Sequence, residues 1–283
     1  MSHATMNPTD TVAPHGPGGN PGTIGADDVR RLAVLTSGLK RRIRSLLELS
    51  LGQRVLDAGC GPGLDAVVVA DRVGPGGRVI GIDYDASMIR EAMASGHRAP
   101  ARVWYQVADA AAIPYGPDTF DRCYSERVLQ HTGNAAAVVA ELVRVTKPGG
   151  VLVVADTDWA TLSIDTCEPA VERALVRFAG ETIRNGFAGR QLRRLMKSAG
   201  LTDVAIELWP IAWTDYESFR ATSLLLLDMG RRSVRAGVIS DAALDRFETG
   251  LADAGRRGVF FASSVVIVAR GRKSGGYAPQ AIE

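Results

Sequence analysis

The chain has 283 residues, of which 46% are hydrophobic and 23% charged, the balance of an ordinary globular protein. Its net charge of +2 is too small to indicate a nucleic-acid partner, and its three cysteines are widely spaced and odd in number, so they form neither a disulfide framework nor a zinc pattern. No stretch approaches the length of a membrane span, and the N-terminus lacks the order of a signal peptide. We therefore expect a cytoplasmic protein without a metal site.

Residues 1–25 are rich in Gly, Pro, Thr and Asn and have almost no large apolar side chain, which predicts a disordered tail. Residues 26–50 predict an N-terminal cap helix that starts at Asp27 or Asp28 and has one apolar and one basic face. We favour a helix packed on the domain with its basic face in solvent. The alternative is a helix that closes over a substrate.

The most informative stretch is 54–63, Arg-Val-Leu-Asp-Ala-Gly-Cys-Gly-Pro-Gly. A short apolar run that ends at Asp57 predicts a strand buried on both faces. Gly59, Gly61 and Gly63 follow at every second position, and an apolar-periodic segment follows them. The pattern predicts a strand, a glycine turn and a helix, whose unpaired N–H groups can meet a ligand.

Two classes of cofactor are bound by such a turn. The dinucleotide fingerprint G-x-G-x-x-G requires a third glycine at position 64, where Leu64 stands. The spacing here is Asp-x-Gly-x-Gly-x-Gly, and the carboxylate of Asp57 would repel a pyrophosphate at close range. A nicotinamide cofactor is therefore the less favoured interpretation.

Alternating apolar runs and turns predict further strands. They cover residues 78–82, 101–107, 120–124, 151–155, 204–209 and 259–269. The second strand ends at Asp83, whose carboxylate can accept hydrogen bonds from two ribose hydroxyls. Segments 157–200 and 211–235 exceed single crossover connections, so we expect them to wall a substrate cavity. Residues 271–283 predict a second disordered tail.

Several of these motifs recur in order in one family. They are the glycine motif, Asp83, Ala108-Asp109-Ala110, Phe120-Asp121 and the turn Lys147-Pro148-Gly149-Gly150. The chain resembles the class I S-adenosylmethionine (SAM) methyltransferases over about residues 50–160, and within them the type 11 branch, which includes ubiquinone and menaquinone C-methyltransferases. The resemblance implies an α/β fold over residues 51–270, with a Rossmann-like, doubly wound sheet of seven strands, the last antiparallel, and helical cap segments.

The resemblance also implies SAM as the cofactor and assigns residues to it. In the family, the acidic residue of the glycine motif lies near the amino group of the cofactor's methionine, and we carry this over to Asp57. An acidic side chain and the next backbone amide meet the adenine, which we carry over to Asp109 and Ala110. The predicted cofactor-binding residues are Asp57, Gly59, Cys60, Gly61, Gly63, Asp83, Tyr84, Met88, Asp109, Ala110 and Ser125. For Met88, core packing is an equal alternative.

Ser125, Glu126 and His131 leave the carboxyl end of the fourth strand, where open α/β sheets bind ligands. We therefore place them near the cofactor sulfonium. His131 is the first candidate for a catalytic base, because histidine titrates near neutral pH, and Glu126 is the second. The alternative for His131 is a helix cap or a packing contact.

Together these features predict a SAM-dependent methyltransferase of secondary metabolism. Its substrate would be a small, largely apolar molecule such as a quinone or terpenoid, methylated on carbon or oxygen. A cyclase or other protein that binds SAM without transferring its methyl group is the alternative, and an NAD(P)-dependent oxidoreductase ranks below it. We expect no nucleic-acid partner, and a homo-oligomer is left open.

Overall fold

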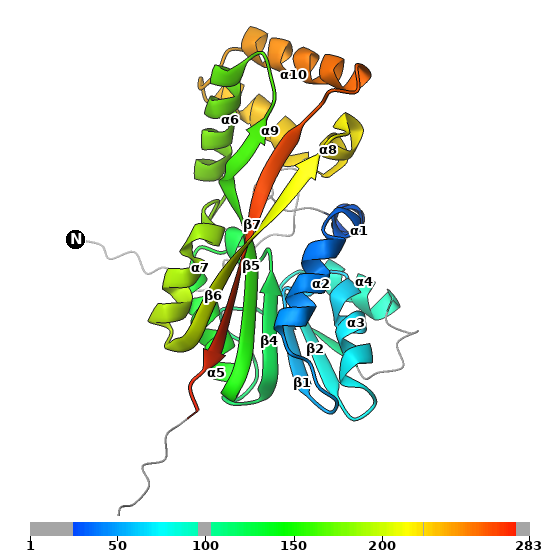
Figure 1. Ribbon diagram of the computed structural model, residues 1–283, viewed down its shortest axis with the longest axis vertical. Coiled ribbons are helices and arrows are strands. Elements are labelled where there is room, and N and C mark those ends of the chain that lie inside the picture. Colours follow the sequence, from blue (N-terminus) through cyan, green and yellow to red (C-terminus); the bar gives the residue numbers. More distant parts are fainter. Residues whose placement is uncertain (1–24, 96–102, 223, 276–283) are drawn as a thin grey trace, which may run out of the picture.

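A single mixed sheet organises the computed structural model, which describes residues 25–95, 103–222 and 224–275. Its strand order is β3-β2-β1-β4-β5-β7-β6, and β7 runs antiparallel to both of its neighbours (Figure 1). The strands are β1 (Arg54–Ala58), β2 (Arg78–Asp83), β3 (Val103–Val107), β4 (Phe120–Glu126), β5 (Thr146–Ile164), β6 (Leu201–Trp213) and β7 (Ala262–Lys273). The predicted fold class, a seven-stranded sheet with an antiparallel last strand, is confirmed.

Helices cover both faces of the sheet, and further helices form a second layer beyond it. Apolar residues of α2 and α3 pack on one face, and those of α5 and α7 pack on the other. The helices are α1 (Ala26–Leu35), α2 (Ser37–Leu46), α3 (Leu64–Val73), α4 (Ala86–Ser95), α5 (Ala135–Val145), α6 (Pro169–Thr182), α7 (Ala188–Ser198), α8 (Tyr216–Thr222), α9 (Leu224–Arg235) and α10 (Asp241–Arg256). A 3-10 turn, η2 (Leu129–His131), follows β4.

Three strands extend beyond the parallel part of the sheet. β4 pairs with β5 only as far as Ala155, whereas β5 pairs with β7 as far as Asp158 and, after a register shift, again from Ser163 to Ile164. The far halves of β5, β6 and β7 carry α6, α8, α9 and α10, which we call the cap (Figure 1). The fifth strand is therefore much longer than the predicted 151–155.

The C-terminal boundary was predicted too early. β7 begins three residues after the expected start at 259 and continues to Lys273, so the proposed tail from 271 overlaps a strand. The ammonium of Lys273 binds the carboxylate of Asp118 at 2.7 Å, which holds this end of the strand. Residues 1–24 and 276–283, which make up most of the two predicted tails, lie outside the described residues.

The N-terminal helix predicted over 26–50 is two helices that meet at Thr36. The hydroxyl of Thr36 donates to the carbonyl of Leu32 at 2.8 Å, and the residue is fully buried. α1 contacts α8 of the cap, whereas α2 buries Leu39 and Ile43 in the core below. The break thus lets one segment contact both the sheet layer and the cap.

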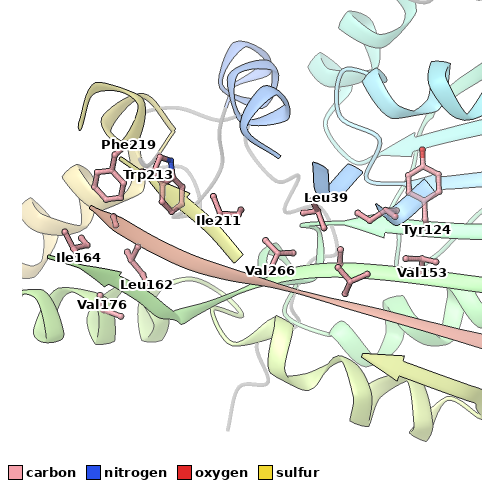
Figure 2. Close-up of a cluster of buried hydrophobic side chains, with 14 of the residues drawn as sticks. Leu39, Tyr124, Val153, Leu162, Ile164, Val176, Ile211, Trp213, Phe219 and Val266 are labelled. Carbon is pink, nitrogen blue, oxygen red and sulfur yellow. The ribbon is translucent and has the colours of Figure 1, made fainter. Parts of the chain in front are cut away.

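One hydrophobic core joins the sheet layer to the cap. Figure 2 shows it running from Leu39 and Tyr124 past Val266 to Trp213 and Phe219. Of the segment 157–200, α6 belongs to the cap, while α7 packs on the sheet beside α5. The cap is therefore an outgrowth of the same core.

A large-to-small change in α10 tests this continuity. Phe247 is 1% exposed in the shared core, so Phe247→Ala should lower the free energy of unfolding by about 3–5 kcal/mol. Urea denaturation should still show one cooperative transition. Thr249→Ala, at an exposed position of the same helix, is the control and should change stability by less than about 0.5 kcal/mol. Two separate transitions would contradict a shared core.

Candidate functional site

The glycine turn follows β1 at the carboxyl edge of the sheet. Gly59, Gly61 and Gly63 all have positive φ, at 83°, 51° and 77°. The amides of Gly59 and Cys60 donate to the carbonyl of Ile82 at 2.7 and 2.9 Å, which ties the turn to the end of β2. L-residues with side chains rarely adopt this backbone, so the alternate glycines predicted from the spacing are required by the turn itself.

The three glycines differ in what lies beside them. A Cβ at Gly59 would come within 2.0 Å of Val128, and one at Gly63 within 2.4 Å of the Tyr105 hydroxyl. A Cβ at Gly61 would meet only Val29, at 4.0 Å. The outer glycines therefore allow close packing, and the middle one leaves its backbone open to a ligand. This cradle fits a cofactor that lies against the main chain.

Asp57 is buried beneath the turn, with 3% of its surface exposed. Its carboxylate accepts a hydrogen bond from the hydroxyl of Tyr124 at 2.6 Å. Burial raises the pKa of Asp57 to about 8, although the bond from Tyr124 opposes this rise. A cationic group nearby would favour the ionised carboxylate, so the site suits an ammonium.

Asp83 ends β2 and contacts the glycine turn directly. One carboxylate oxygen accepts from the amide of Gly61 at 2.9 Å, and the other accepts from the amide of Asp85 at 2.9 Å. Burial raises the pKa of Asp83, and the backbone hydrogen bonds oppose this effect. A carboxylate has about four lone-pair sites, so it can also accept from a hydroxyl, as ribose recognition requires.

The other predicted cofactor residues occupy different environments. Tyr84 is 58% exposed, Met88 is buried, and Ala110 is at the limit of burial. Asp109 is exposed, and its carboxylate accepts from the amide of Ala111 at 2.8 Å. Its position after β3 is therefore accessible to a ligand.

Cys60 and Ser125 are both buried. Burial raises the pKa of the Cys60 thiol, which fits the expectation of a packed thiol. The hydroxyl of Ser125 has no hydrogen-bond partner in the part of the chain that the structure describes. An unpaired buried hydroxyl is uncommon, and a ligand at the end of β4 could pair with it.

Glu126 is held in an ion network that the sequence did not predict. The ammonium of Lys40, on α2, lies 2.9 Å from the Glu126 carboxylate and also contacts Asp65 at the start of α3. Arg44 binds the second oxygen of Asp65 at 2.6 Å. Burial alone would raise the pKa of Glu126, but Lys40 and Arg127 lower it, so this residue is an ionised, paired carboxylate.

Asp156 positions the turn that contains His131. Its carboxylate accepts from the amides of Leu129 at 2.7 Å and Gln130 at 3.3 Å. Burial raises the pKa of Asp156 to about 7, against the effect of these hydrogen bonds. Nε2 of the His131 ring lies 3.1 Å from the side-chain amide nitrogen, Nε2, of Gln130. Burial, aided by Arg127, lowers the pKa of His131 to about 4, so the imidazole is neutral and weakly basic.

No cluster of three or more metal-ligating side chains occurs within residues 25–95, 103–222 and 224–275. None of the helices in these ranges is long and apolar enough to cross a membrane.

Comparison with known proteins identifies the family. A family model described as a methyltransferase domain, of type 11, matches residues 56–154. The O-methyltransferase resE of Aspergillus sclerotiorum is 31% identical over 188 residues, which cover 64% of this chain and 68% of that protein. The chain belongs to the class I SAM-dependent methyltransferases, type 11 branch. An uncharacterized 37.1 kDa protein in transposon TN4556 of Streptomyces fradiae is 37% identical over 224 residues.

The alignment with the transposon protein covers 78% of this chain and 63% of that protein, so this chain spans less than two thirds of that relative. Among solved structures, the YcgJ protein of Bacillus subtilis superposes with a TM-score of 0.61 at 20% identity. That match covers 85% of this chain and 100% of YcgJ, and it supports the fold.

The buried network of Lys40 gives a stability prediction. Lys40→Met leaves the Glu126 carboxylate without its closest cation, so unfolding should become easier by about 2–4 kcal/mol. Arg41→Met is the matched control, since Arg41 is exposed on the same helix and should cost less than about 0.5 kcal/mol. Chemical denaturation measures both, and equal effects would show that Lys40 is not a buried ion-pair partner.

Asp57 gives a prediction about pH. Its folded pKa of about 8 exceeds the ordinary value, so between about pH 4 and pH 8 the folded state binds the extra proton. Stability should therefore fall as pH rises through this window, and Asp57→Asn should remove that part of the loss. The free-energy advantage of the variant should grow from pH 5 to pH 8 by about 1–4 kcal/mol. Asp156 titrates in both proteins, so its effect cancels when the free energy of unfolding of the wild type is subtracted from that of the variant. If that difference stays constant with pH, the pKa of Asp57 is not raised.

Proposed function

We propose that this protein transfers a methyl group from SAM to a small, largely apolar molecule, on carbon or oxygen. The observation that carries the proposal is the open glycine cradle, bordered by Asp57 and Asp83, beneath a cap that shares the apolar core of the sheet. A quinone, a terpenoid or another specialised metabolite fits such a setting. The relative named an O-methyltransferase supports this class of reaction.

The residues around the turn would hold the cofactor in a fixed order. Asp57 would pair with its amino group, Asp83 would accept from the ribose hydroxyls, and Asp109 with the amide of Ala110 would meet the adenine. Met88 and Tyr84 would flank the ring, and the hydroxyl of Ser125 would reach the end nearest β4. The assignments of Asp57, Asp109 and Ala110 are carried over from the family, and the others rest on their positions near the strand ends.

When bound, SAM supplies a methyl group already activated by its sulfonium. The chain's own residues need only hold the acceptor in line with that group and exclude water. The carboxylate of Glu126 lies at the end of β4, and because Lys40 and Arg127 already balance its charge, it would do little to offset the positive charge of the bound cofactor. His131 would contact the acceptor from η2.

The cap contributes apolar surface above this edge. Ala179 and Ile183, at the C-terminal end of α6, form a small buried cluster with Met229 of α9. Trp159 and Phe178 pack against this cluster and are only partly buried. An apolar acceptor would contact these two side chains and not the cluster beneath them.

Calorimetric titration with SAM, S-adenosylhomocysteine and NADH tests the cofactor site first. The first two should bind and NADH should not. Asp83→Ala should weaken SAM binding by about tenfold or more, because the ribose hydroxyls of the cofactor would lose both contacts to this carboxylate. Asp71→Ala is the control, since Asp71 is exposed on α3, and it should leave the affinity unchanged.

Turnover is the second arm of this test. Release of S-adenosylhomocysteine with a panel of hydroquinones, phenols and terpenes would support methyl transfer. Tight SAM binding with no turnover on any of them would favour a protein that holds SAM without transferring its methyl group. Binding of NADH alone would overturn the proposal.

A further inference from the structure

The side chains of Trp159, Gln130 and His131 form a hydrogen-bonded chain that runs from β5 to η2. The indole N–H of Trp159 donates to Oε1 of Gln130 at 2.7 Å. Nε2 of Gln130 lies 3.1 Å from Nε2 of His131 and donates to the carbonyl of Arg127 at 3.4 Å. Gln130 itself is 5% exposed, and Asp156 accepts from its backbone amide.

Chemistry fixes the direction of each bond in this chain. An indole nitrogen can only donate, so Oε1 of Gln130 must be the atom that faces Trp159. The amide nitrogen of Gln130 is then turned toward His131, and it too can only donate. Nε2 of His131 therefore accepts, and the single proton of the neutral ring sits on Nδ1. Burial favours the neutral ring, as its lowered pKa indicates.

The proton on Nδ1 has no partner of its own. Nδ1 of His131 is buried and makes no hydrogen bond within the described residues. Buried N–H groups are nearly always paired in native proteins, so an unpaired one beside a ligand-binding edge indicates an acceptor that arrives with a ligand. The lone pair that a catalytic base would use is meanwhile occupied by Gln130.

The chain also connects this donor to the cap. Trp159 lies where the register of β5 and β7 shifts, between Asp158 and Ser163. Its ring packs against the cluster of Ala179, Ile183 and Met229. Trp159, which packs against the cap, thus fixes the position of Gln130, and through Gln130 it fixes the tautomer of His131.

We propose that Trp159 and Gln130 hold His131 as an Nδ1–H donor, which selects substrates that present an oxygen acceptor, such as a phenol or carbonyl oxygen. His131 then orients the acceptor molecule and does not remove its proton. Gln130 and Trp159 are positioning residues. This inference rests on the proposed function and names the group by which its substrate is recognised.

The tautomer is directly measurable without a substrate. In protein labelled with ¹⁵N-histidine, long-range ¹H–¹⁵N spectra distinguish the protonated from the unprotonated ring nitrogen. His131→Asn assigns the signals among the four histidines of the chain. We expect protonation at Nδ1 at neutral pH. In Gln130→Glu at high pH, the new carboxylate is ionised and can accept but not donate. The neutral ring of His131 should then carry its proton on Nε2. An Nε2–H tautomer in the wild type would overturn the proposal.

Ligand selection is tested on protein saturated with S-adenosylhomocysteine, with 1-naphthol and naphthalene as probes. The wild type should bind 1-naphthol about tenfold more tightly than naphthalene. His131→Asn keeps a side-chain N–H donor but has no basic atom, so it should retain most of this preference. His131→Ala should reduce it to less than about threefold.

Equal preference in the wild type and His131→Ala would refute the role of His131 as donor. Loss of the preference in both variants, with binding of S-adenosylhomocysteine intact, would also refute it, because Asn supplies the donor. Failure to bind S-adenosylhomocysteine would instead count against the proposed function as a whole. The two failures are therefore distinguishable.

Discussion

Strands β5 and β7 pair from Val151 opposite Arg272 to Asp158 opposite Val265, and after a register shift again at Ser163 and Ile164, past the point where β4 ends. Beyond Ala155, β5 loses its pairing with β4 but keeps β7, so the sheet narrows into an antiparallel ribbon. The edge released by β4 is where Asp156 and Trp159 meet η2. The same ribbon carries the cap (Figure 1). Site and cap are both placed by this one extension of strand pairing.

Several carboxylates at the carboxyl edge of the sheet are buried without enough hydrogen bonds or cations to balance the loss of water. Asp57, Asp83 and Asp156 all have pKa values raised by burial, whereas Glu126 is kept ionised by Lys40 and Arg127. Carboxylates with raised pKa values are groups whose charge a bound cation or donor would favour. Such carboxylates would suit a ligand that brings hydroxyls and positive charge with it.

The sequence predicted those features that depend on local chemistry. The alternate glycines and the acidic residues at strand ends lie where their spacing placed them, because a turn with positive φ and a strand end are local structures. The length of β5 was not predictable, since its polar run Asp156-Thr157-Asp158 pairs with residues about a hundred positions away. Nor was the role of Lys40, because only the tertiary docking of α2 distinguishes it from the neighbouring Arg41. His131 was recognisable by type, but its bound proton depends on Gln130 and Trp159.

The shared ribbon also bears on modularity. The cap is encoded in two pieces: α6 follows β5, whereas α8, α9 and α10 lie between β6 and β7, so α7 and β6 separate the two pieces. Cutting out residues between β5 and β7 would remove β6 and α7, and joining a foreign cap would require its ends to match two antiparallel strands. Diversification of substrate range on this scaffold would therefore proceed by side-chain replacement within the cap and not by exchange of the cap as a unit.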